Sequence, residues 1–527
     1  MEFILNNLVL QLYENEEILK ERIIKSLKIN KDINFSYKII KKAIDARKKY
    51  DILFVYSCLI EIDNYEIKNN PNIKKLDHSF EDIEFPRIKP NKRPIIVGFG
   101  PAGMFLGLSL ARANAKPIIL ERGRKVEDRA RDVELFKKNG IFSSLSNVCF
   151  GEGGAGTFSD GKLTTNINDP RIRFILKEFI SHGAPKEIYY DAHPHIGSDY
   201  LQVVCKNIRE EIISLGGEIH FESLFTNFIE ENNQIKGIEY IEDGKKKYLE
   251  TDDLILSLGH SSRDTFINLY RNNLHMEPKA FSLGVRIEMK QKEVNISQYG
   301  KEYNNPKLKA AEYKLVTHLP NGRSVYTFCM CPGGVVTPSN TEENTIVSNG
   351  MSFFSRDLEN ANSALLVNVK VEDYYKNSPL DGMHFQEEVE KKAFSNKYPY
   401  FAPVQLLGDF LNDRCSTGFK SVKATYLPGT YFRKLDEILP PFISDSLKEA
   451  IPLLANKMKA LGNSDNVLTG VETRSSSPIS IPRDENYMSS IKGIYPCGEG
   501  AGYAGGITTA ALDGIKVAES IIDKYLK

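Results

Sequence analysis

The sequence has no excess of charge of either sign and no long apolar run. Lysine plus arginine number 69, and aspartate plus glutamate also number 69, so the formal net charge is zero. No overall field therefore favours nucleic acid or an anionic membrane as a partner. No apolar run approaches the roughly 20 residues that a membrane-spanning helix needs. The N-terminus, MEFILNNLVLQLYENEE, also lacks the basic-then-apolar pattern of an export signal.

Cysteine and histidine are scarce for a chain of this size. Seven cysteines in 527 residues do not form a disulfide framework. The spacing of these cysteines and of the nine histidines does not resemble a closed zinc site. We therefore predict no metal and a cytoplasmic location. A hydrophobic content of 41% and a charged content of 26% are typical of a soluble globular protein, here long enough for about two to four domains.

A glycine motif at residues 98–103 is the strongest signal of function. Gly98, Gly100 and Gly103 form Gly-x-Gly-x-x-Gly between the apolar run 94–97 and a helix-like stretch. Such a turn brings backbone close to a dinucleotide pyrophosphate at a helix N-terminus. An ordinary glycine-rich βα turn is the alternative, but the strand before and the helix after the motif favour a dinucleotide-binding site. The predicted pyrophosphate residues are Gly98, Gly100, Pro101, Ala102 and Gly103.

An acidic residue ends the next predicted strand. Glu121 follows the apolar segment 117–120, at the position where a carboxylate accepts hydrogen bonds from an adenosine ribose. This favours FAD or NAD over NADP. The adjacent Arg122 either adds charge near the phosphates or adenine, or is a solvated surface arginine.

A second glycine-rich segment follows at residues 151–161. Five of its eleven residues are glycine, which argues against a helix or central strand and suits backbone lying against a ligand. A flexible surface loop is the alternative. The residues predicted to approach the cofactor are Gly153, Gly154, Ala155, Gly156 and Thr157.

Strand-then-glycine patterns occur twice more. A β-meander is predicted from strands at 218–221, 228–238 and 245–250, followed by a buried strand that ends at Gly259. Near the C-terminus, a strand leads into Gly498-Glu499 and then into a small-residue helix start at 506–508. No second Gly-x-Gly-x-x-Gly lies between a strand and a helix, so we predict one dinucleotide site.

These segments, in this order, resemble the FAD-binding fold of glutathione-reductase-type flavoproteins. The resemblance implies that Gly259 ends the strand after the meander and that Glu499 binds the flavin ribitol, where the usual acid is aspartate. It also implies that backbone amides of Gly506, Ile507 and Thr508 face the flavin pyrimidine edge, where a positive helix end raises the flavin potential.

Longer blocks narrow the resemblance. The segments FGEGGAGTFSDGKL (150–163), HPHIGSD (193–199), FSLGVRIE (281–288), TFCMCPGGVV (327–336), NGMS (349–352), GVETRSSSP (470–478) and YPCGEGAGYAGGI (495–507) are similar to a bacterial family of uncharacterised FAD-dependent dehydrogenases. The similarity runs from about residue 37 to the end. It implies FAD as the cofactor and leaves the substrate open.

We therefore predict an α/β protein with three parts: a Rossmann-type, glutathione-reductase-like FAD-binding domain, an inserted α+β substrate domain and a small N-terminal α/β module. In that module strand-like and helix-like patterns alternate over 3–12, 17–27, 37–47 and 52–62. The predicted boundaries are 1–75 for the N-terminal module, 76–92 for a linker, 93–260 and 485–527 for the two parts of the FAD domain, and 261–484 for the insert.

Cys329 and Cys331 are the first catalytic candidates. A C-x-C pair can exchange with a substrate disulfide while the flavin changes redox state. On an extended strand, however, residues i and i+2 are about 7 Å apart, too far for an unstrained disulfide. Two buried thiols ahead of a glycine turn are therefore the alternative.

His195 and two arginines complete the catalytic candidates. His195, held by Asp199, is a candidate proton donor, although Asp199 also suits the N-cap of the following helix. Arg474 and Arg286 are candidates for binding a substrate carboxylate or phosphate. Structural pairing with Glu472 or Glu288 is the alternative.

The leading functional prediction is an FAD-dependent oxidoreductase that transfers a hydride between a small organic substrate and FAD. Its electron partner would be the substrate, a diffusing NAD(P)H or an electron-transfer protein. One alternative is an RNA-modifying flavoprotein, because residues 20–49 hold 11 basic and 3 acidic residues; a solvated helix face is the simpler explanation. A non-catalytic, redox-sensing flavoprotein is the other alternative.

Overall fold

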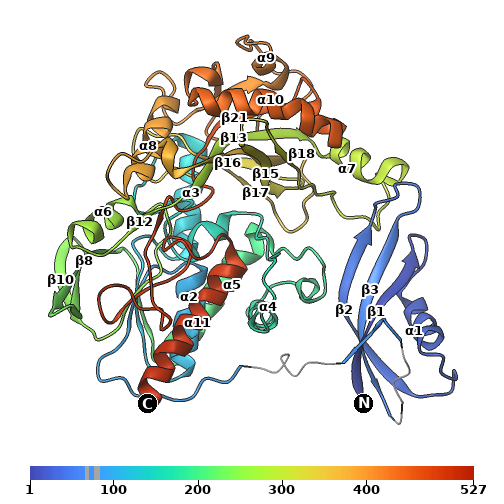
Figure 1. The fold of residues 1–527 in the computed structure, drawn as a ribbon, viewed down its shortest axis with the longest axis horizontal. Coiled ribbons are helices and arrows are strands. Elements are labelled where there is room, and N and C mark those ends of the chain that lie inside the picture. Colours follow the sequence, from blue (N-terminus) through green and yellow to red (C-terminus); the bar gives the residue numbers. More distant parts are fainter. Residues whose placement is uncertain (64, 66–69, 76–82) are drawn as a thin grey trace.

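The computed structural model describes residues 1–63, 65, 70–75 and 83–527. Figure 1 shows three parts: a central α/β unit, a large sheet capped by helices above it, and a separate sheet that contains the N-terminus. The predicted linker 76–92 lies partly outside the described residues. Its later part packs on the central unit, where Ile88 is buried and its amide donates to the Ala113 carbonyl at 2.8 Å.

The central unit is built on a five-stranded parallel sheet with the order β23-β11-β5-β6-β7. Its strands are short and almost wholly apolar, as expected for a parallel sheet covered on both faces. They are β5 (Ile95–Val97), β6 (Ile118–Leu120), β7 (Glu218–His220), β11 (Leu254–Leu256) and β23 (Ile494–Pro496).

Alternate side chains of this sheet belong to two different cores. Ile96, Ile119 and Ile255 pack with the helices on one face, whereas Ile95 and Leu254 pack with the antiparallel strands on the other. The period of two in strand geometry produces this division. In Figure 1, α2 and α11 lie side by side in the helical layer. That layer contains α2 (Pro101–Arg112), α4 (Arg171–Ser181), α5 (Gly197–Ser214) and α11 (Ile507–Leu526), and α3 (Val126–Asn139) contacts α5.

The predicted meander is partly wrong. Its first segment, 218–221, forms β7 of the parallel sheet instead, and the predicted strand 228–238 contains a turn at Asn232 and Asn233, both with positive φ. Asparagine tolerates this left-handed conformation, so the chain reverses there. The observed meander consists of β8 (Ser223–Glu231), β9 (Gln234–Glu242) and β10 (Lys245–Glu250), with α6 (Arg263–Arg271) packed on β8.

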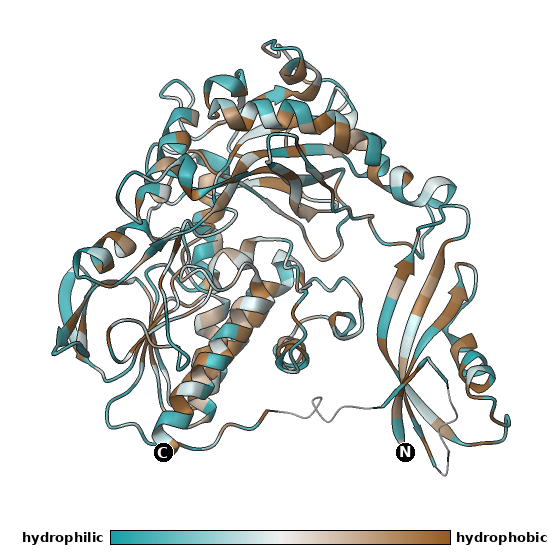
Figure 2. Cartoon of the chain, in the orientation of Figure 1, coloured by the Kyte–Doolittle hydropathy of each residue, from teal (hydrophilic) through white to brown (hydrophobic). Residues whose placement is uncertain are grey.

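The inserted part is a seven-stranded mixed sheet with the order β14-β15-β18-β13-β21-β19-β20. Apolar residues run along its strands (Figure 2) and form the largest core with α7 (Gln291–Tyr299) and α10 (Pro441–Lys457). The chain enters and leaves beside a short pair, β12 (Glu277–Pro278) and β22 (Ile479–Ser480). The remaining elements are β13 (Phe281–Lys290), β14 (Val316–His318), β15 (Ser324–Cys331), β16 (Val335–Pro338), β17 (Ser348–Met351), β18 (Asn360–Val369), α8 (Asp381–Ala393), β19 (Ala402–Leu406), α9 (Leu407–Leu411), β20 (Thr430–Phe432) and β21 (Val467–Glu472).

The N-terminal module is a four-stranded antiparallel sheet with one helix. Its order is β2-β3-β1-β4, from β1 (Glu2–Gln11), α1 (Leu19–Leu27), β2 (Phe35–Asp45), β3 (Leu53–Ile62) and β4 (Ile73–Lys75). Strand and helix therefore do not simply alternate here, because the last two predicted segments are neighbouring strands. The basic run 20–49 is not one helix face either: it spans α1, β2 and the following turn.

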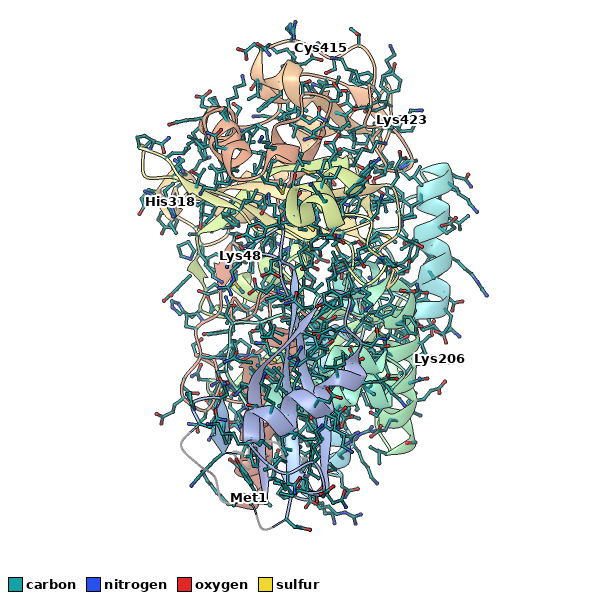
Figure 3. The ribbon with its side chains drawn as sticks, turned by 90° about the vertical axis from the view of Figure 1, so that its right-hand side faces the viewer. Met1, Lys48, Lys206, His318, Cys415 and Lys423 are labelled. Atoms are coloured by element: carbon teal, nitrogen blue, oxygen red, sulfur yellow. The ribbon has the colours of Figure 1, made fainter. Side chains whose placement is uncertain are left out.

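This module touches both other parts. The Lys42 amide of β2 donates to the Tyr190 carbonyl at 2.6 Å, and the Ala192 amide donates to the Lys42 carbonyl at 2.9 Å. At the β2–β3 turn, Lys49 packs against Gly300 of the insert, and Lys48 lies at the lower edge of that part in Figure 3. No helix among the described residues has both the length and the apolar character needed to cross a bilayer.

Candidate cofactor and active site

A cavity of about 370 Å³ opens at the carboxyl ends of the parallel strands. This is the edge at which open α/β sheets bind ligands. Its walls come from 97–102 after β5, 120–122 after β6, 257–262 after β11 and 505–507 before α11. The insert closes the other side with Phe328, Cys329, Ser339, Asn349 and Arg474.

Two helix N-termini border this cavity. Helix α2 begins after Gly100 and α11 begins after Gly506, and neither helix has a side-chain N-cap. Their first amides lack intrahelical acceptors and carry positive partial charge, which suits an anion such as a pyrophosphate.

Space for a ligand is kept by glycine. A Cβ atom at Gly259, Gly505 or Gly506 would meet no atom within 4 Å, and at Gly100 it would touch only the Gly154 Cα, at 3.8 Å. These backbone positions therefore face open space. We call the glycine positions 100, 259, 505 and 506 the cradle, and it fits a dinucleotide whose phosphates approach the backbone.

Two glycines of the motif are required by close contacts within the protein. Gly98 has φ +98°, and a Cβ there would lie 2.5 Å from the Ser257 carbonyl oxygen. Within α2, a Cβ on Gly103 would lie 2.0 Å from the Gly98 carbonyl oxygen. Gly103 is predicted to bind the pyrophosphate but does not line the cavity; its lack of a side chain instead allows α2 to pack closely on the turn at Gly98.

Glu121 lies at the cavity wall but is already engaged by backbone. Its two carboxylate oxygens accept hydrogen bonds from the amides of Phe99 (2.9 Å), Gly123 (2.9 Å) and Gly151 (3.0 Å). Each carboxylate oxygen has more than one lone pair, so Glu121 can still accept a hydrogen bond from a ribose hydroxyl. The residue thus also ties together three loops of the cradle.

Arg122 is not a solvated surface arginine. Its guanidinium stacks 4.4 Å from the Phe150 ring centroid and donates to Asp264 and to the Thr265 hydroxyl. Both Arg122 and Phe150 line the cavity, so the arginine forms part of its wall rather than a free phosphate ligand.

The glycine-rich segment, for which the sequence predicts no helix or central strand, contains a short 3₁₀ helix over Gly154–Phe158. Gly154, Ala155 and Gly156 line the cavity. Gly153 and Thr157 do not: a Cβ on Gly153 would meet the Thr157 Oγ1 at 2.0 Å. Those two residues shape the turn behind the cavity wall.

The C-terminal predictions divide in the same way. Glu499, Gly506 and Ile507 line the cavity. The Gly498 amide instead donates to Asp513 at 2.7 Å, and the Thr508 hydroxyl donates to the Leu163 carbonyl at 2.8 Å. These contacts hold the segment in place.

His260 is a site residue that the sequence reasoning missed. Its Nδ1 lies 3.3 Å from the Glu499 Oε1, and both its ring nitrogens are buried without a hydrogen-bond partner among the described residues. Both residues line the cavity. A buried, unpaired imidazole beside an acid marks a polar position that a bound ligand can satisfy. The sequence feature that could have identified His260 is its position directly after Gly259.

Lys162 is a second missed residue. It lines the cavity and lies 3.3 Å from Asp160 and 3.1 Å from Glu312. Burial alone would lower the pKa of Lys162, but these two carboxylates outweigh it and raise that pKa. The ammonium therefore stays charged at the cavity wall. Lysine within the glycine-rich block was the available signal.

The surroundings of His195 do not support its predicted role as a proton donor. His195 does not line the cavity; it is buried, stacks on Phe354, and its Nε2 contacts the Phe354 carbonyl at 3.1 Å. Burial and then the charge of Arg356 lower its pKa to about 4, so the ring is neutral near pH 7. Asp199 does not hold the ring but accepts from the Phe354 amide at 3.0 Å, and it lies in the first turn of α5 rather than at its cap.

The two arginine candidates are bound by protein carboxylates. Arg474 reaches the cavity wall, but its guanidinium pairs with Glu390 (2.7 Å) and Glu342 (3.2 Å). Arg286 is fully buried and pairs with Glu472 at 2.9 Å. Neither guanidinium is free to bind a substrate anion. Arg286 pairs with Glu472, as in the structural alternative, whereas Arg474 pairs with neither Glu472 nor Glu288 but with Glu390 and Glu342.

The C-x-C pair does not lie on a regular strand. The pairing of β15 with β18 shifts register between Phe328 and Cys331, and Cys329 has φ +42°. This bulge turns Cys329 into the cavity wall, whereas Cys331 is fully buried. The strand-based separation of about 7 Å therefore does not apply here.

A glycine-lined cradle at the carboxyl edge of a parallel sheet, with a helix N-terminus beside it, is typical of a dinucleotide-binding protein. A family model described as FAD-dependent protein, C-terminal domain-like, matches residues 280–475, and a model of a domain of unknown function matches 4–61. An uncharacterized protein of Clostridium beijerinckii is 47% identical over 530 residues, which cover 99% of this chain and 98% of the relative. The chain belongs to this family of FAD-dependent proteins, and FAD is its cofactor.

Solved flavoprotein structures resemble the chain more distantly. A flavin-dependent brominase has 12% identity and a TM-score of 0.37, covering 82% of this chain and 79% of its own. E. coli quinol fumarate reductase has 10% identity and a TM-score of 0.37, covering 84% of this chain and 71% of its own. The L-proline dehydrogenase from P. horikoshii has 11% identity and a TM-score of 0.34, covering 84% of this chain and 95% of its own.

Proposed function

We propose that the protein is an oxidoreductase that transfers a hydride between a small organic substrate and FAD held in the cavity. The observation that carries this proposal is that one cavity joins the dinucleotide cradle to the insert, through Phe328 and Cys329 of β15. A cofactor held there meets a wall made by a different part of the chain. Such a shared cavity suits a substrate bound over a cofactor.

The residues divide the work of binding. The first turn of α2 would bind the pyrophosphate, Glu121 would bind the adenosine ribose, and Glu499 with His260 would bind the ribitol hydroxyls. Amides at the start of α11 would offer positive partial charge to the flavin. FAD itself supplies a two-electron acceptor and donor. Lys162 stays protonated at the cavity wall, where it is paired with Asp160 and Glu312.

The electron partner is the substrate itself, a diffusing nicotinamide or an electron-transfer protein. A cytoplasmic location and the absence of a nucleic-acid partner remain predictions. In the N-terminal module Lys42 pairs with Glu16 and Arg47 with Asp45, so part of the basic run is already neutralised and we propose no RNA function.

The test is an anaerobic absorbance spectrum of FAD-loaded protein, followed by rapid mixing with NADH and then with NADPH. Rapid bleaching by one nicotinamide supports a reductase. An oxidised flavin that a small organic donor bleaches supports a dehydrogenase. A flavin that photoreduces but that neither nicotinamides nor organic donors reduce contradicts the enzyme and supports a redox-sensing role.

A matched pair of variants ties the result to this cavity. Gly506→Val places a side chain in the cradle, and Gly418→Val places one on an exposed loop; neither Cβ meets another atom within 4 Å. We expect the first variant to lose FAD and the second to keep it. Equal FAD content in the two folded variants contradicts the proposed cradle.

A further inference from the structure

The bulge in β15 gives Cys329 an environment unlike that of the buried thiols. Burial raises the pKa of Cys58 and of Cys205 to about 12, as expected for thiols that only fill space. Cys329 instead borders the cavity in a left-handed conformation that non-glycine residues rarely adopt. Unfavourable backbone of this kind persists where the surrounding structure holds it, and it clusters at functional sites.

Four groups affect the pKa of this thiol. The neighbouring Cys331 thiol, followed by the charges of Arg286 and Lys162, lowers the pKa of Cys329, against the opposing effects of burial and of Glu472. The neighbouring Cys329 thiol and burial raise the pKa of Cys331.

Contacts of Arg286 fix the arrangement. Its Nη2 donates to the Cys329 carbonyl at 2.6 Å and lies 3.6 Å from the Cys331 Sγ, and the Cys331 thiol lies 3.4 Å from the same carbonyl. One guanidinium therefore holds both cysteines at the end of β15. Cys329 lines the cavity, and Cys331, two residues further along the chain, is fully buried.

We propose that Cys329 is a nucleophile, that Cys331 is its resolving thiol, and that the substrate is a small disulfide. This assignment rests on the proposed function, because bound reduced FAD supplies the electrons.

The exchange balances as follows. The Cys329 thiolate attacks one sulfur of the substrate, the substrate S–S bond breaks, and one substrate thiolate leaves. The Cys331 thiol loses its proton to solvent and attacks the Cys329 sulfur, which releases the second substrate thiolate and leaves a Cys329–Cys331 disulfide. Two electrons from reduced FAD and two protons restore both thiols. The substrate disulfide is reduced to two thiols.

The first test is the pH dependence of iodoacetamide labelling of FAD-loaded protein, read at each cysteine by peptide mass spectrometry. Cys415 is exposed and distant from the cavity, so it serves as the internal reference. We expect Cys329 to label with a midpoint below the pH of about 8.5 that is usual for a cysteine thiol. Cys331→Ala removes the hydrogen-bond donor and should slow Cys329 labelling at pH 7 about tenfold. Cys331→Ser keeps a donor and should restore most of the rate. A Cys329 that stays unlabelled at pH 8 while Cys415 reacts overturns the proposal.

The second test uses 5,5′-dithiobis(2-nitrobenzoate) as the disulfide probe. In the unmodified chain we expect a Cys329–Cys331 disulfide and release of both halves of the probe. In Cys331→Ser we expect a stable mixed disulfide on Cys329 with one half released. A mixed disulfide that persists on Cys329 in the unmodified chain overturns the resolving role.

FAD content and reduction by nicotinamide are measured on the same preparations. Bound FAD that is reduced normally while Cys329 stays inert contradicts the thiol chemistry alone. Protein that binds no FAD after reconstitution contradicts the proposed function itself, whatever the cysteines do.

Discussion

Arg286 and Glu472 form an ion pair in the interior of the seven-stranded sheet, with two guanidinium–carboxylate contacts of 2.9 and 3.0 Å. They lie on neighbouring strands, β13 and β21, and both are buried. The pair holds the arginine that in turn holds the two cysteines of β15. A charge this deep depends on its partner, so the pair connects the stability of the insert to the geometry of the cavity wall.

Removing one partner should therefore be costly. Glu472→Gln leaves the Arg286 charge buried and uncompensated, and we expect a loss of about 3–5 kcal/mol, measured as a lower urea midpoint. The control is Glu134→Gln, which breaks an exposed pair with Lys138 on α3 and should change stability by less than about 0.5 kcal/mol. Similar midpoints for the two variants would contradict this role of the pair.

Two glycine substitutions should separate folding from cofactor binding. Gly103→Ala pushes a methyl group against the Gly98 carbonyl, so the apoprotein should melt at a markedly lower temperature. Gly100→Ala meets only an ordinary contact at Gly154 and should fold normally. Its methyl group occupies the cradle, so FAD affinity should fall about tenfold, or about 1.4 kcal/mol. Thermal melts of apoprotein and FAD titrations distinguish the two effects. Equal melting temperatures would show that Gly103 is not needed for packing.

Glu121 should affect both folding stability and FAD binding. Glu121→Ala leaves three buried amides without an acceptor, and each costs about 1–3 kcal/mol, so the variant should bind little FAD and unfold early. Glu121→Gln keeps one acceptor oxygen, so its stability and FAD content should lie between those of Glu121→Ala and those of the unmodified chain. Glu210→Gln, on the exposed side of α5, is the control and should behave as the unmodified chain. Full FAD occupancy in a well-folded Glu121→Ala would contradict its role in tying the loops together.

His195 should appear in the acid stability of the protein. Its pKa is lowered from 6.5 to about 4 in the folded chain, so between these values the unfolded chain binds a proton that the folded chain does not. Folding stability therefore falls as the pH drops from 6.5 to 4, by about 3 kcal/mol in total. His195→Gln should lose less stability between pH 7 and pH 5 in urea titrations. His318→Gln, on the surface (Figure 3), should follow the unmodified chain. Parallel curves for all three proteins would contradict the lowered pKa.

The parts of the fold that the sequence predicts are those in which neighbouring residues carry the signal. The Gly98–Gly103 turn, Glu121 at the end of the next strand and the helix start at Gly506 are local patterns, and their strand and helix contexts are written beside them. The α/β architecture and the FAD cofactor follow from these segments and are confirmed.

Features set by distant partners could not be predicted in the same way. The bulge at Cys329 depends on the register between β15 and β18, which are separated along the chain. Arg474 could not be assigned to Glu390 because the two residues are 84 positions apart in sequence. Segment 218–221 has the alternation of a strand, but nothing local says that it joins the parallel sheet rather than the meander. The burial of His195 likewise depends on Phe354, far along the chain.

The contact between β2 and residues 190–192 has a consequence for the behaviour of the chain in solution. β2 is the outermost strand of its sheet, and an open strand edge offers unpaired amides and carbonyls to other molecules. The hydrogen bonds at Lys42 cover part of that edge with the chain's own backbone. Loss of the N-terminal module would strip the same cover from residues 190–192, so a shortened chain should be more prone to self-association than the whole one.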